Sequence, residues 1–173
     1  MNAAQQHAEP APGTLCFHCG LPVPGARAPV QETPEGTRWF CCAGCEAVSR
    51  FIQGSGLDDF YRLRAASSRR PEADPSLRET LALYDEPAML GRFTTRSPEG
   101  VLEADLIVEG MTCPACAWLV EHALLRVPGI ASANVNFATR RAAVRWREGA
   151  ARASAIFASV LDCGCRAWPF EAG

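Results

Sequence analysis

The sequence predicts an α+β protein with a small cysteine-rich N-terminal domain and a larger C-terminal domain. Two observations support this prediction. Between residues 101 and 170, apolar residues switch between the two-residue period of strands and the stripe of amphipathic helices, in the order β-α-β-β-α-β. Between residues 15 and 64, closely spaced cysteines stand in a segment too short to bury a large core. A chain of 173 residues has room for both units and a linker.

The C-terminal elements follow one another with short breaks. Residues 101–109 alternate apolar and acidic side chains, which is typical of a half-buried strand, and residues 116–127 form a helical stripe that ends at Pro128. Two alternating segments, an alanine-rich helix and a short strand follow at residues 131–137, 141–147, 150–161 and 166–170. Pro169 places the last strand at a sheet edge, because proline cannot donate to a central ladder. Right-handed connections then put both helices on one face of a ferredoxin-like antiparallel sheet.

The N-terminal cysteines are expected to bind a metal. The pairs Cys16/Cys19 and Cys42/Cys45 have the spacing of a zinc-ribbon or treble-clef site, and a four-thiolate metal would supply the folding energy that so small a domain lacks. The alternative is that these reduced cysteines serve as small core residues.

Two neighbours of these pairs are expected to take no part in the site. Cys41 is left over, and His18 is expected to point to solvent rather than to the metal. The sequence predicts four segments: a disordered leader at residues 1–14, the cysteine-rich domain at residues 15–64, a Ser/Arg/Pro/Ala-rich linker with a partly ordered connector at residues 65–98, and the C-terminal domain at residues 99–173.

Composition excludes several functions. The basic residues are all arginine, so a P-loop and a Schiff-base enzyme both lack their lysine, and the net charge of -2 does not suggest a nucleic-acid surface. The N-terminus has no secretory signal and no run approaches the roughly 18 to 20 apolar residues of a membrane span, so the chain is expected to be cytoplasmic. Nine cysteines in a reducing compartment favour metal ligands over disulfides.

A further pair, Cys113/Cys116, lies where the first C-terminal strand pattern gives way to a helix pattern. A helix N-terminus favours the anionic thiolate, and two thiolates without other ligands suit Cu(I) better than zinc, which takes four. The spacing alone also fits a thioredoxin-type redox pair or half of a zinc site.

The loop at residues 110–116 has the sequence Gly-Met-Thr-Cys-Pro-Ala-Cys. With this loop, residues 101–170 resemble the heavy-metal-associated domain of copper chaperones and copper-pumping P-type ATPases. Further stretches are similar to the subgroup of these pumps that supplies copper for cytochrome oxidase assembly. In the C-terminal domain these are residues 116–121, 128–130 and 135–141. Residues 16–24 and 40–45 resemble the metal-binding domain that precedes the heavy-metal-associated domain in that subgroup, and residues 83–87 resemble its connector.

The resemblance implies that Cys113 and Cys116 bind Cu(I) and pass it to a copper chaperone or to pump domains by thiolate exchange, which is not catalysis. It also implies zinc or copper at the N-terminal cysteines and a monomer. The membrane helices and aspartyl-phosphate loop of such pumps are not in this sequence, so the chain is expected to be the cytosolic N-terminal part of a pump, with a free-standing copper chaperone as the alternative. Handover requires thiols that a partner can reach.

Two other classes of function remain open. A thiol-disulfide oxidoreductase would use the same Cys113/Cys116 pair, although the sequence offers no candidate for the cis-proline that faces such a pair in thioredoxin-type folds. A zinc-ribbon adaptor would account for residues 15–64 and leave the C-terminal domain unused.

The chain departs from the family pattern just before its last strand. Where the family has glycine followed by an aromatic residue, this chain has Cys165 after Gly164. Cys165 is expected either to be a third thiolate for the metal or to face away as a small strand residue, and Cys163 is expected to be a bystander.

Overall fold

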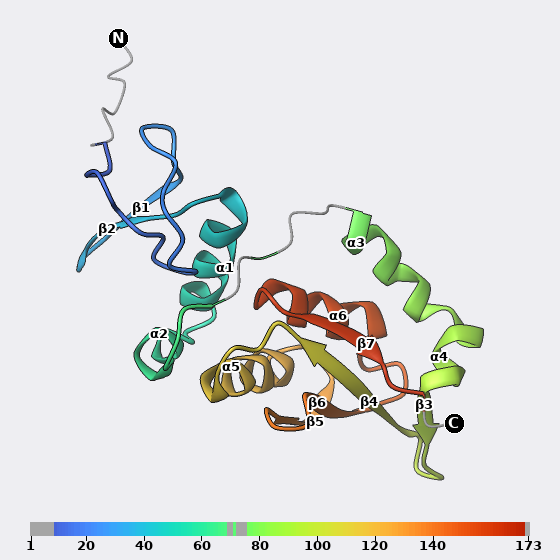
Figure 1. Ribbon diagram of the computed structural model, residues 1–173. Coiled ribbons are helices and arrows are strands. Elements are labelled where there is room, and N and C mark those ends of the chain that lie inside the picture. Colours follow the sequence, from blue (N-terminus) through green and yellow to red (C-terminus); the bar gives the residue numbers. More distant parts are fainter. Residues whose placement is uncertain (1–8, 69–70, 72–75, 172–173) are drawn as a thin grey trace.

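The computed structural model describes residues 9–68, 71 and 76–171 of the chain (Figure 1). Its elements are, in order, β1 (Val30–Thr33), β2 (Gly36–Trp39), α1 (Ala43–Gly54), α2 (Asp59–Leu63), α3 (Ser76–Thr80), the 3-10 helix η1 (Leu81–Asp85), α4 (Pro87–Phe93), β3 (Thr94–Arg96), β4 (Val101–Glu109), α5 (Pro114–Leu125), β5 (Ile130–Asn136), β6 (Arg141–Arg147), α6 (Ala153–Asp162) and β7 (Arg166–Pro169). Part of the predicted leader, residues 1–8, lies outside the described residues.

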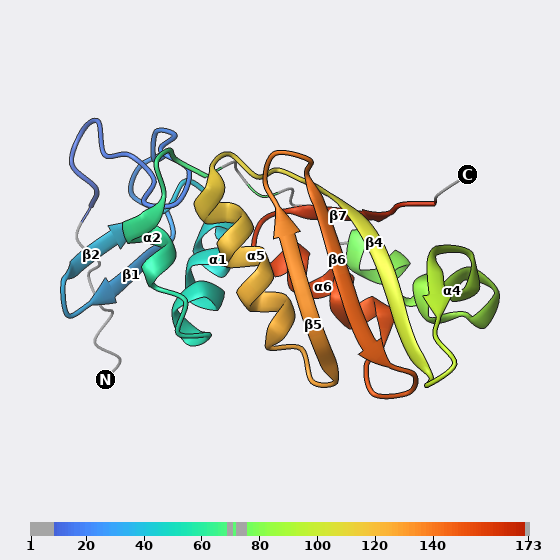
Figure 2. The same ribbon diagram turned by 90° about the horizontal axis from the view of Figure 1, so that it is seen from below.

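The C-terminal domain confirms the predicted ferredoxin-like α+β fold. Strand β4 lies between β6 and β7, β5 pairs with β6, and every pairing is antiparallel. Helices α5 and α6 pack on each other and on the sheet, as Figure 2 shows from below. The turn that ends α6 and leads into β7 therefore lies beside the loop that joins β4 to α5.

One strand of the C-terminal sheet was not predicted, nor was the N-terminal β1–β2 hairpin. Strand β3 pairs with the first half of β4, opposite Leu102–Ala104, whereas β7 pairs with its second half, opposite Leu106–Glu109. The two short strands thus divide one edge of β4 between them. Pro169 ends β7 at this edge, as expected for a residue without a backbone donor.

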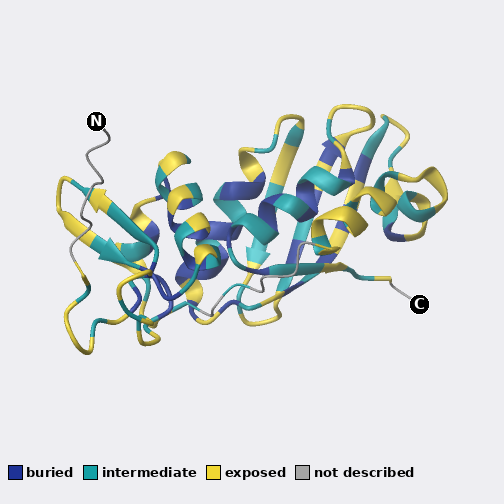
Figure 3. Cartoon of the chain, turned by 90° about the horizontal axis from the view of Figure 1, so that it is seen from above, coloured by how far each residue is buried: buried dark blue, intermediate teal, exposed yellow. Residues whose placement is uncertain are grey.

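The core lies between the helices and one face of the sheet. Along β4, Leu102, Ala104, Leu106 and Val108 are buried while the intervening residues are largely exposed, and Trp146 of β6 is 1% exposed. Figure 3 shows the buried positions gathered where the helices face the sheet. Burial of this alternating face is the main contribution to the stability of the domain.

The predicted linker contains ordered elements that pack on α6. The ring of Tyr84 in η1 stacks on Phe157 of α6, with ring centroids 4.2 Å apart. The Asp85 carboxylate accepts hydrogen bonds from the backbone N–H and the hydroxyl of Ser154, at 2.9 and 2.6 Å. Because Ser154 lies in the first turn of α6, Asp85 acts as a helix cap supplied by another part of the chain. The domain boundaries themselves stay a prediction.

The N-terminal domain consists of the β1–β2 hairpin and helices α1 and α2, which lie against the end of the C-terminal domain where α5 begins (Figures 1 and 2). Helix α2 contacts α5, and α1 contacts α6. Ile52, Leu57 and Phe60 belong to the same buried cluster as the C-terminal core. The two domains therefore share one continuous apolar interior.

Candidate metal centres

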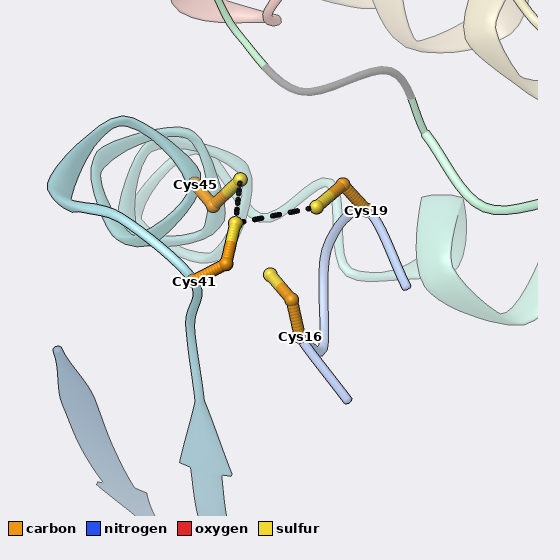
Figure 4. Close-up of side chains that lie close together, drawn as sticks. All are labelled: Cys16, Cys19, Cys41 and Cys45. Carbon is orange, nitrogen blue, oxygen red and sulfur yellow. Dashed lines mark hydrogen bonds between the residues drawn. The ribbon is translucent and has the colours of Figure 1, made fainter. Parts of the chain in front are cut away.

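Four buried cysteines of the N-terminal domain converge on one point. The sulfur atoms of Cys16, Cys19, Cys41 and Cys45 all lie within 4.8 Å of one another (Figure 4). The Cys19 and Cys41 sulfurs are 3.4 Å apart, and those of Cys41 and Cys45 are 3.7 Å apart. A tetrahedral site with metal–sulfur bonds of about 2.3 Å has sulfurs about 3.8 Å apart, so this arrangement fits a four-thiolate metal.

Local backbone geometry brings the first two sulfurs together. The backbone N–H of Gly20 donates to the carbonyl of Cys16 at 2.9 Å, which closes a tight turn over residues 16–20. Gly20 has a φ of 73°, a conformation that side-chain-bearing residues rarely adopt. This turn, called the 16–20 turn below, directs both cysteines toward the segment between β2 and α1.

The second half of the cluster differs from the sequence prediction, because Cys41 takes the place expected for Cys42. Cys42 is the N-cap residue of α1, and its sulfur accepts a hydrogen bond from the backbone N–H of Cys45 at 3.5 Å. The Cys42 side chain thus caps its own helix, and its sulfur is not one of the four that converge. A cysteine placed immediately before a helix is the sequence signal that could have indicated this cap.

Hydrogen bonds between the thiols concentrate negative charge on one sulfur. The Cys45 thiol donates to Cys16 and lowers the pKa of Cys16 to about 4, against the opposing effect of burial. Burial, followed by the hydrogen bond with Cys19, raises the pKa of Cys41 to about 12. The pKa of Cys45 is raised well above its ordinary value, chiefly by its hydrogen bond to Cys16. A cation at this point would compensate the charge that the clustered sulfurs develop when they ionise.

The expectation that His18 points to solvent is wrong. Its side chain is 1% exposed and its Nδ1 lies 3.1 Å from the Tyr61 hydroxyl. Its Nε2 atom is buried without a hydrogen-bond partner among the described residues. Burial, and then the positive charge of Arg64, lower the pKa of His18 to about 4. His18 lies outside the cluster of four sulfurs, so the structure does not make it part of that site.

The second cysteine pair lies where β4 leads into α5, as predicted. Cys113 is the N-cap residue of α5, in an extended conformation, and Cys116 lies in the first turn. Gly110 begins the loop with a φ of 93°. The Thr112 hydroxyl lies 3.5 Å from the Cys116 sulfur. Both thiols therefore belong to a single loop supported by a strand and a helix.

The environment of Cys113 favours its thiolate form. Burial alone would raise its pKa, but the backbone N–H groups of Ala65, Cys116 and Ala115 act in the opposite direction, and the net result is a lowered pKa. Two of these donors belong to the start of α5, where unsatisfied N–H groups favour an anion. The third, Ala65, belongs to the segment that follows α2.

We expected the Cys113 and Cys116 thiols to be accessible to a partner protein, but in the structure they are not. Cys113 and Cys116 are each 4% exposed, because the N-terminal domain lies over their loop. The sequence does not reveal this contact, because it depends on how the two domains pack.

Cys165 lies beside the same loop. A Cβ atom placed on Gly110 would come 3.8 Å from the Cys165 sulfur, so this side chain is directed at the loop. Burial, and then the charge of Cys116, raise the pKa of Cys165 to about 12. Burial likewise raises the pKa of Cys163. Among the described residues, the sulfurs of Cys113, Cys116 and Cys165 do not form a ready-made group of the kind seen in the N-terminal domain.

Comparison with protein families assigns both halves of the chain. Residues 15–97 match the family described as "Putative metal-binding domain of cation transport ATPase", and residues 105–164 match the heavy-metal-associated domain. The chain carries these two domains in tandem. Both are metal-binding domains, and neither match is to a catalytic domain.

Similar proteins agree with this assignment. Residues of this chain are 48% identical over 60 residues to Copper-transporting ATPase 2 of Rhizobium meliloti, covering 35% of this chain and 7% of that protein. They are 30% identical over 127 residues to the Copper-exporting P-type ATPase of Bacillus subtilis, covering 71% of this chain and 15% of that protein. The tandem domains are thus homologous to the N-terminal regions of copper-transporting P-type ATPases, and the chain spans only a small part of the length of these relatives.

A solved structure is similar to the heavy-metal-associated domain. The N-terminal domain of a potential copper-translocating P-type ATPase from Bacillus subtilis, in its Cu(I)-loaded state, is 33% identical, with a TM-score of 0.38. The match covers 40% of this chain and 86% of that domain.

Two further observations bear on the alternatives. In the described part of the chain, no helix is long and apolar enough to cross a membrane. The described backbone also contains no cis peptide bond.

Proposed function

We propose that the tandem domains bind Cu(I) at Cys113 and Cys116 and transfer it by thiolate exchange. The observation that carries this proposal is the position of both thiols at the N-terminus of α5, where backbone N–H groups lower the pKa of Cys113. A lowered pKa makes the thiolate easier to form, and the thiolate is the species that binds a soft monovalent ion. The names of the two ATPase relatives support copper as the cargo.

In this proposal the chain is the N-terminal metal-binding region of a copper-transporting P-type ATPase, on the cytosolic side of the membrane. The pump belongs to the type that supplies copper for cytochrome oxidase assembly, which is the finer assignment that the sequence resemblance implies. The partners are a copper chaperone that donates the ion and pump domains that accept it, and the chain acts as a monomer. A handover of this kind replaces one thiolate at a time, so the ion is never released to water.

The four N-terminal cysteines have a different proposed role. Cys16, Cys19, Cys41 and Cys45 hold one metal ion, with zinc favoured over copper because four thiolates at tetrahedral spacing suit zinc. When bound, the metal would link the 16–20 turn to the start of α1. The chain's own residues in this domain bury few other large side chains around the site, so this link is expected to stabilise the fold.

The test of copper binding is a titration of the full chain with Cu(I) against a competing chelator under reducing conditions. The double variant Cys113→Ser/Cys116→Ser is expected to lose one bound Cu(I), while Cys163→Ser, a buried cysteine of the same domain, keeps it. A double variant that still binds one Cu(I) in the heavy-metal-associated domain would refute the proposal.

The same titration decides whether Cys165 is a third ligand. If it is, Cys165→Ser lowers the affinity for Cu(I) at the pair, because one thiolate of three is lost. An unchanged affinity would limit the site to Cys113 and Cys116.

A further inference from the structure

A short segment that follows the N-terminal domain lies next to the Cys113/Cys116 pair. Residues 64–68, called the cover segment below, follow α2 and pass between the 16–20 turn and the loop that carries Cys113. On the side of the Cys113 loop, the backbone N–H of Ala65 donates a hydrogen bond to the Cys113 sulfur. The two thiols of the pair are 4% exposed beneath this packing.

On its other side, the cover segment is attached to the 16–20 turn. The guanidinium group of Arg64 donates to the carbonyl oxygens of Phe17 and His18, at 2.6 and 2.5 Å. The backbone N–H of Ser68 donates to the same His18 carbonyl at 3.2 Å. These carbonyls lie between Cys16 and Cys19, so the atoms that anchor the cover segment belong to the metal-binding turn itself.

The approach of the segment to this turn is close. A Cβ atom placed on Gly20 would come 2.7 Å from the Ser67 hydroxyl oxygen and 3.2 Å from Ser67 Cβ, so a side chain at this position would force Ser67 to move. The position of the cover segment is therefore set by the shape of the 16–20 turn.

A second contact lies next to the cover segment. A Cβ atom on Gly164 would come 3.5 Å from Val48 Cγ2, 3.5 Å from Pro71 Cγ and 3.7 Å from His18 Nε2. Gly164 lies in the turn that also packs against Gly110. The buried His18 Nε2 has no hydrogen-bond partner among the described residues, and an unsatisfied buried nitrogen weakens the contact that buries it.

We propose that the cover segment is a lid over Cys113 and Cys116, held shut by the N-terminal four-cysteine site. With a metal at that site, the 16–20 turn keeps the shape that anchors Arg64 and Ser68, and the pair is shielded from donors and acceptors of copper. When the turn loses this shape, the lid opens and the pair becomes reachable. The dependence on metal rests on the metal-binding role proposed for the N-terminal cysteines, whereas the lid itself rests on the contacts described above.

The test measures how fast Cys113 and Cys116 react with iodoacetamide in the metal-loaded full chain, by mass spectrometry of the peptide that contains both. Arg64→Ala removes both charge-assisted hydrogen bonds to the turn, and the alkylation rate is expected to rise by about tenfold or more. The matched control is Arg62→Ala, which removes only an exposed ion pair with Asp59 and is expected to leave the rate unchanged. Equal alkylation rates for the Arg64→Ala variant and the wild-type protein would overturn the proposal.

A second variant covers the case in which Arg64→Ala does not fold. Gly20→Ala adds a Cβ where Ser67 now lies and is expected to displace the cover segment and raise the alkylation rate at the pair. If retained N-terminal metal shows that Gly20→Ala is folded and the rate is unchanged, the lid is refuted.

Copper is absent from these assays, so their outcome is independent of whether the pair binds Cu(I). The dependence of the alkylation rate on the N-terminal metal is measured separately, by removing that metal from the wild-type protein with a chelator. Faster alkylation after removal supports control by the four-cysteine site, and an unchanged rate contradicts it.

Discussion

The two cysteine sites of this chain are built in opposite ways. The N-terminal site collects four sulfurs from two separate segments, and they lie within 4.8 Å of one another inside a small domain. The C-terminal pair comes from one loop, and most of the buried apolar cluster around it belongs to the C-terminal domain itself, although Ile52, Leu57 and Phe60 of the N-terminal domain join that cluster. A site that joins segments suits a metal that stays, whereas a site carried on a single loop suits a metal that is passed on.

Electrostatics distinguish the sites in the same way. In the N-terminal cluster, the thiols adjust one another, so that the pKa of Cys16 is lowered to about 4 while that of Cys41 is raised to about 12. At the pair, burial opposes a lowered pKa of Cys113, and the backbone N–H groups of Ala65, Cys116 and Ala115, together with the Cys116 thiol, outweigh it. A hydrogen bond between thiols is thus the largest effect on the pKa of Cys16, whereas backbone N–H groups are the leading hydrogen-bond donors at Cys113.

Removal of the N-terminal metal is expected to have the largest effect. Because apparent binding free energies of structural zinc reach about 10 to 16 kcal/mol, the N-terminal domain should lose its fold when a chelator takes the ion. Hydrogen exchange is expected to speed up throughout β1, β2 and α1 and to stay slow in β4 and β6. Loss of protection in both domains together would contradict the contrast between the two sites.

The next largest effect, on metal content, is expected from replacing Cys41 rather than Cys42. Cys41→Ser is expected to abolish the N-terminal metal, since Cys41 is one of the four converging sulfurs. Cys42→Ser should keep it, because serine is a good N-cap residue and can replace the sulfur that caps α1. Metal-to-protein ratios of the purified variants measure this difference, and the opposite result would restore the ligand set predicted from sequence.

In the C-terminal domain, apolar packing rather than metal is expected to set stability. Trp146→Ala leaves a cavity in a core where this residue is 1% exposed, and the expected loss is about 3 to 5 kcal/mol of unfolding free energy. Trp168→Ala, at a position 40% exposed on β7, is the control and should change stability by less than about 1 kcal/mol. Denaturant unfolding followed by circular dichroism provides the comparison, and similar losses for both would contradict it.

The smallest effect is expected at the connector. Burial would raise the pKa of Asp85, but hydrogen bonds from Ser154 and then the Arg152 guanidinium outweigh it, so the pKa lies below its ordinary value of 3.8. A carboxylate with a lowered folded-state pKa contributes stability above its unfolded pKa, and this contribution is lost as the pH falls through the folded pKa. Asp85→Asn should therefore cost about 0.5 to 2 kcal/mol at pH 7 and much less near pH 2. A penalty that does not change with pH would exclude the charge as its cause.

The C-terminal fold could be predicted in detail because its signals are local. Alternation along residues 101–109 and 141–147 and the helical stripe after Cys116 specify each element and its buried face. The position of the Cys113/Cys116 pair at the junction of β4 and α5 follows from the same pattern. Strand β3 was missed, since three residues are too few to show a period and their pairing with β4 is set by the turn between them.

The N-terminal site was predicted only in part. The sequence determines that cysteines cluster there, but Cys41 and Cys42 are adjacent, and spacing cannot decide which one faces the others. The start of α1 decides between them, because the Cys42 sulfur caps this helix by accepting a hydrogen bond from the Cys45 N–H, whereas the Cys41 sulfur lies with the other three.

By itself, the sequence determined the order of the six main elements of the C-terminal domain, the place of the Cys113/Cys116 pair between a strand and a helix, and the presence of clustered cysteines near the N-terminus, because these depend on periodicity and spacing within short segments. The tertiary structure alone decided that His18 is buried, that Cys41 joins the cluster, and that Cys113 and Cys116 are buried. The reason is physical: these features depend on contacts between segments far apart in the chain, and a local pattern carries no information about which distant surface will cover it.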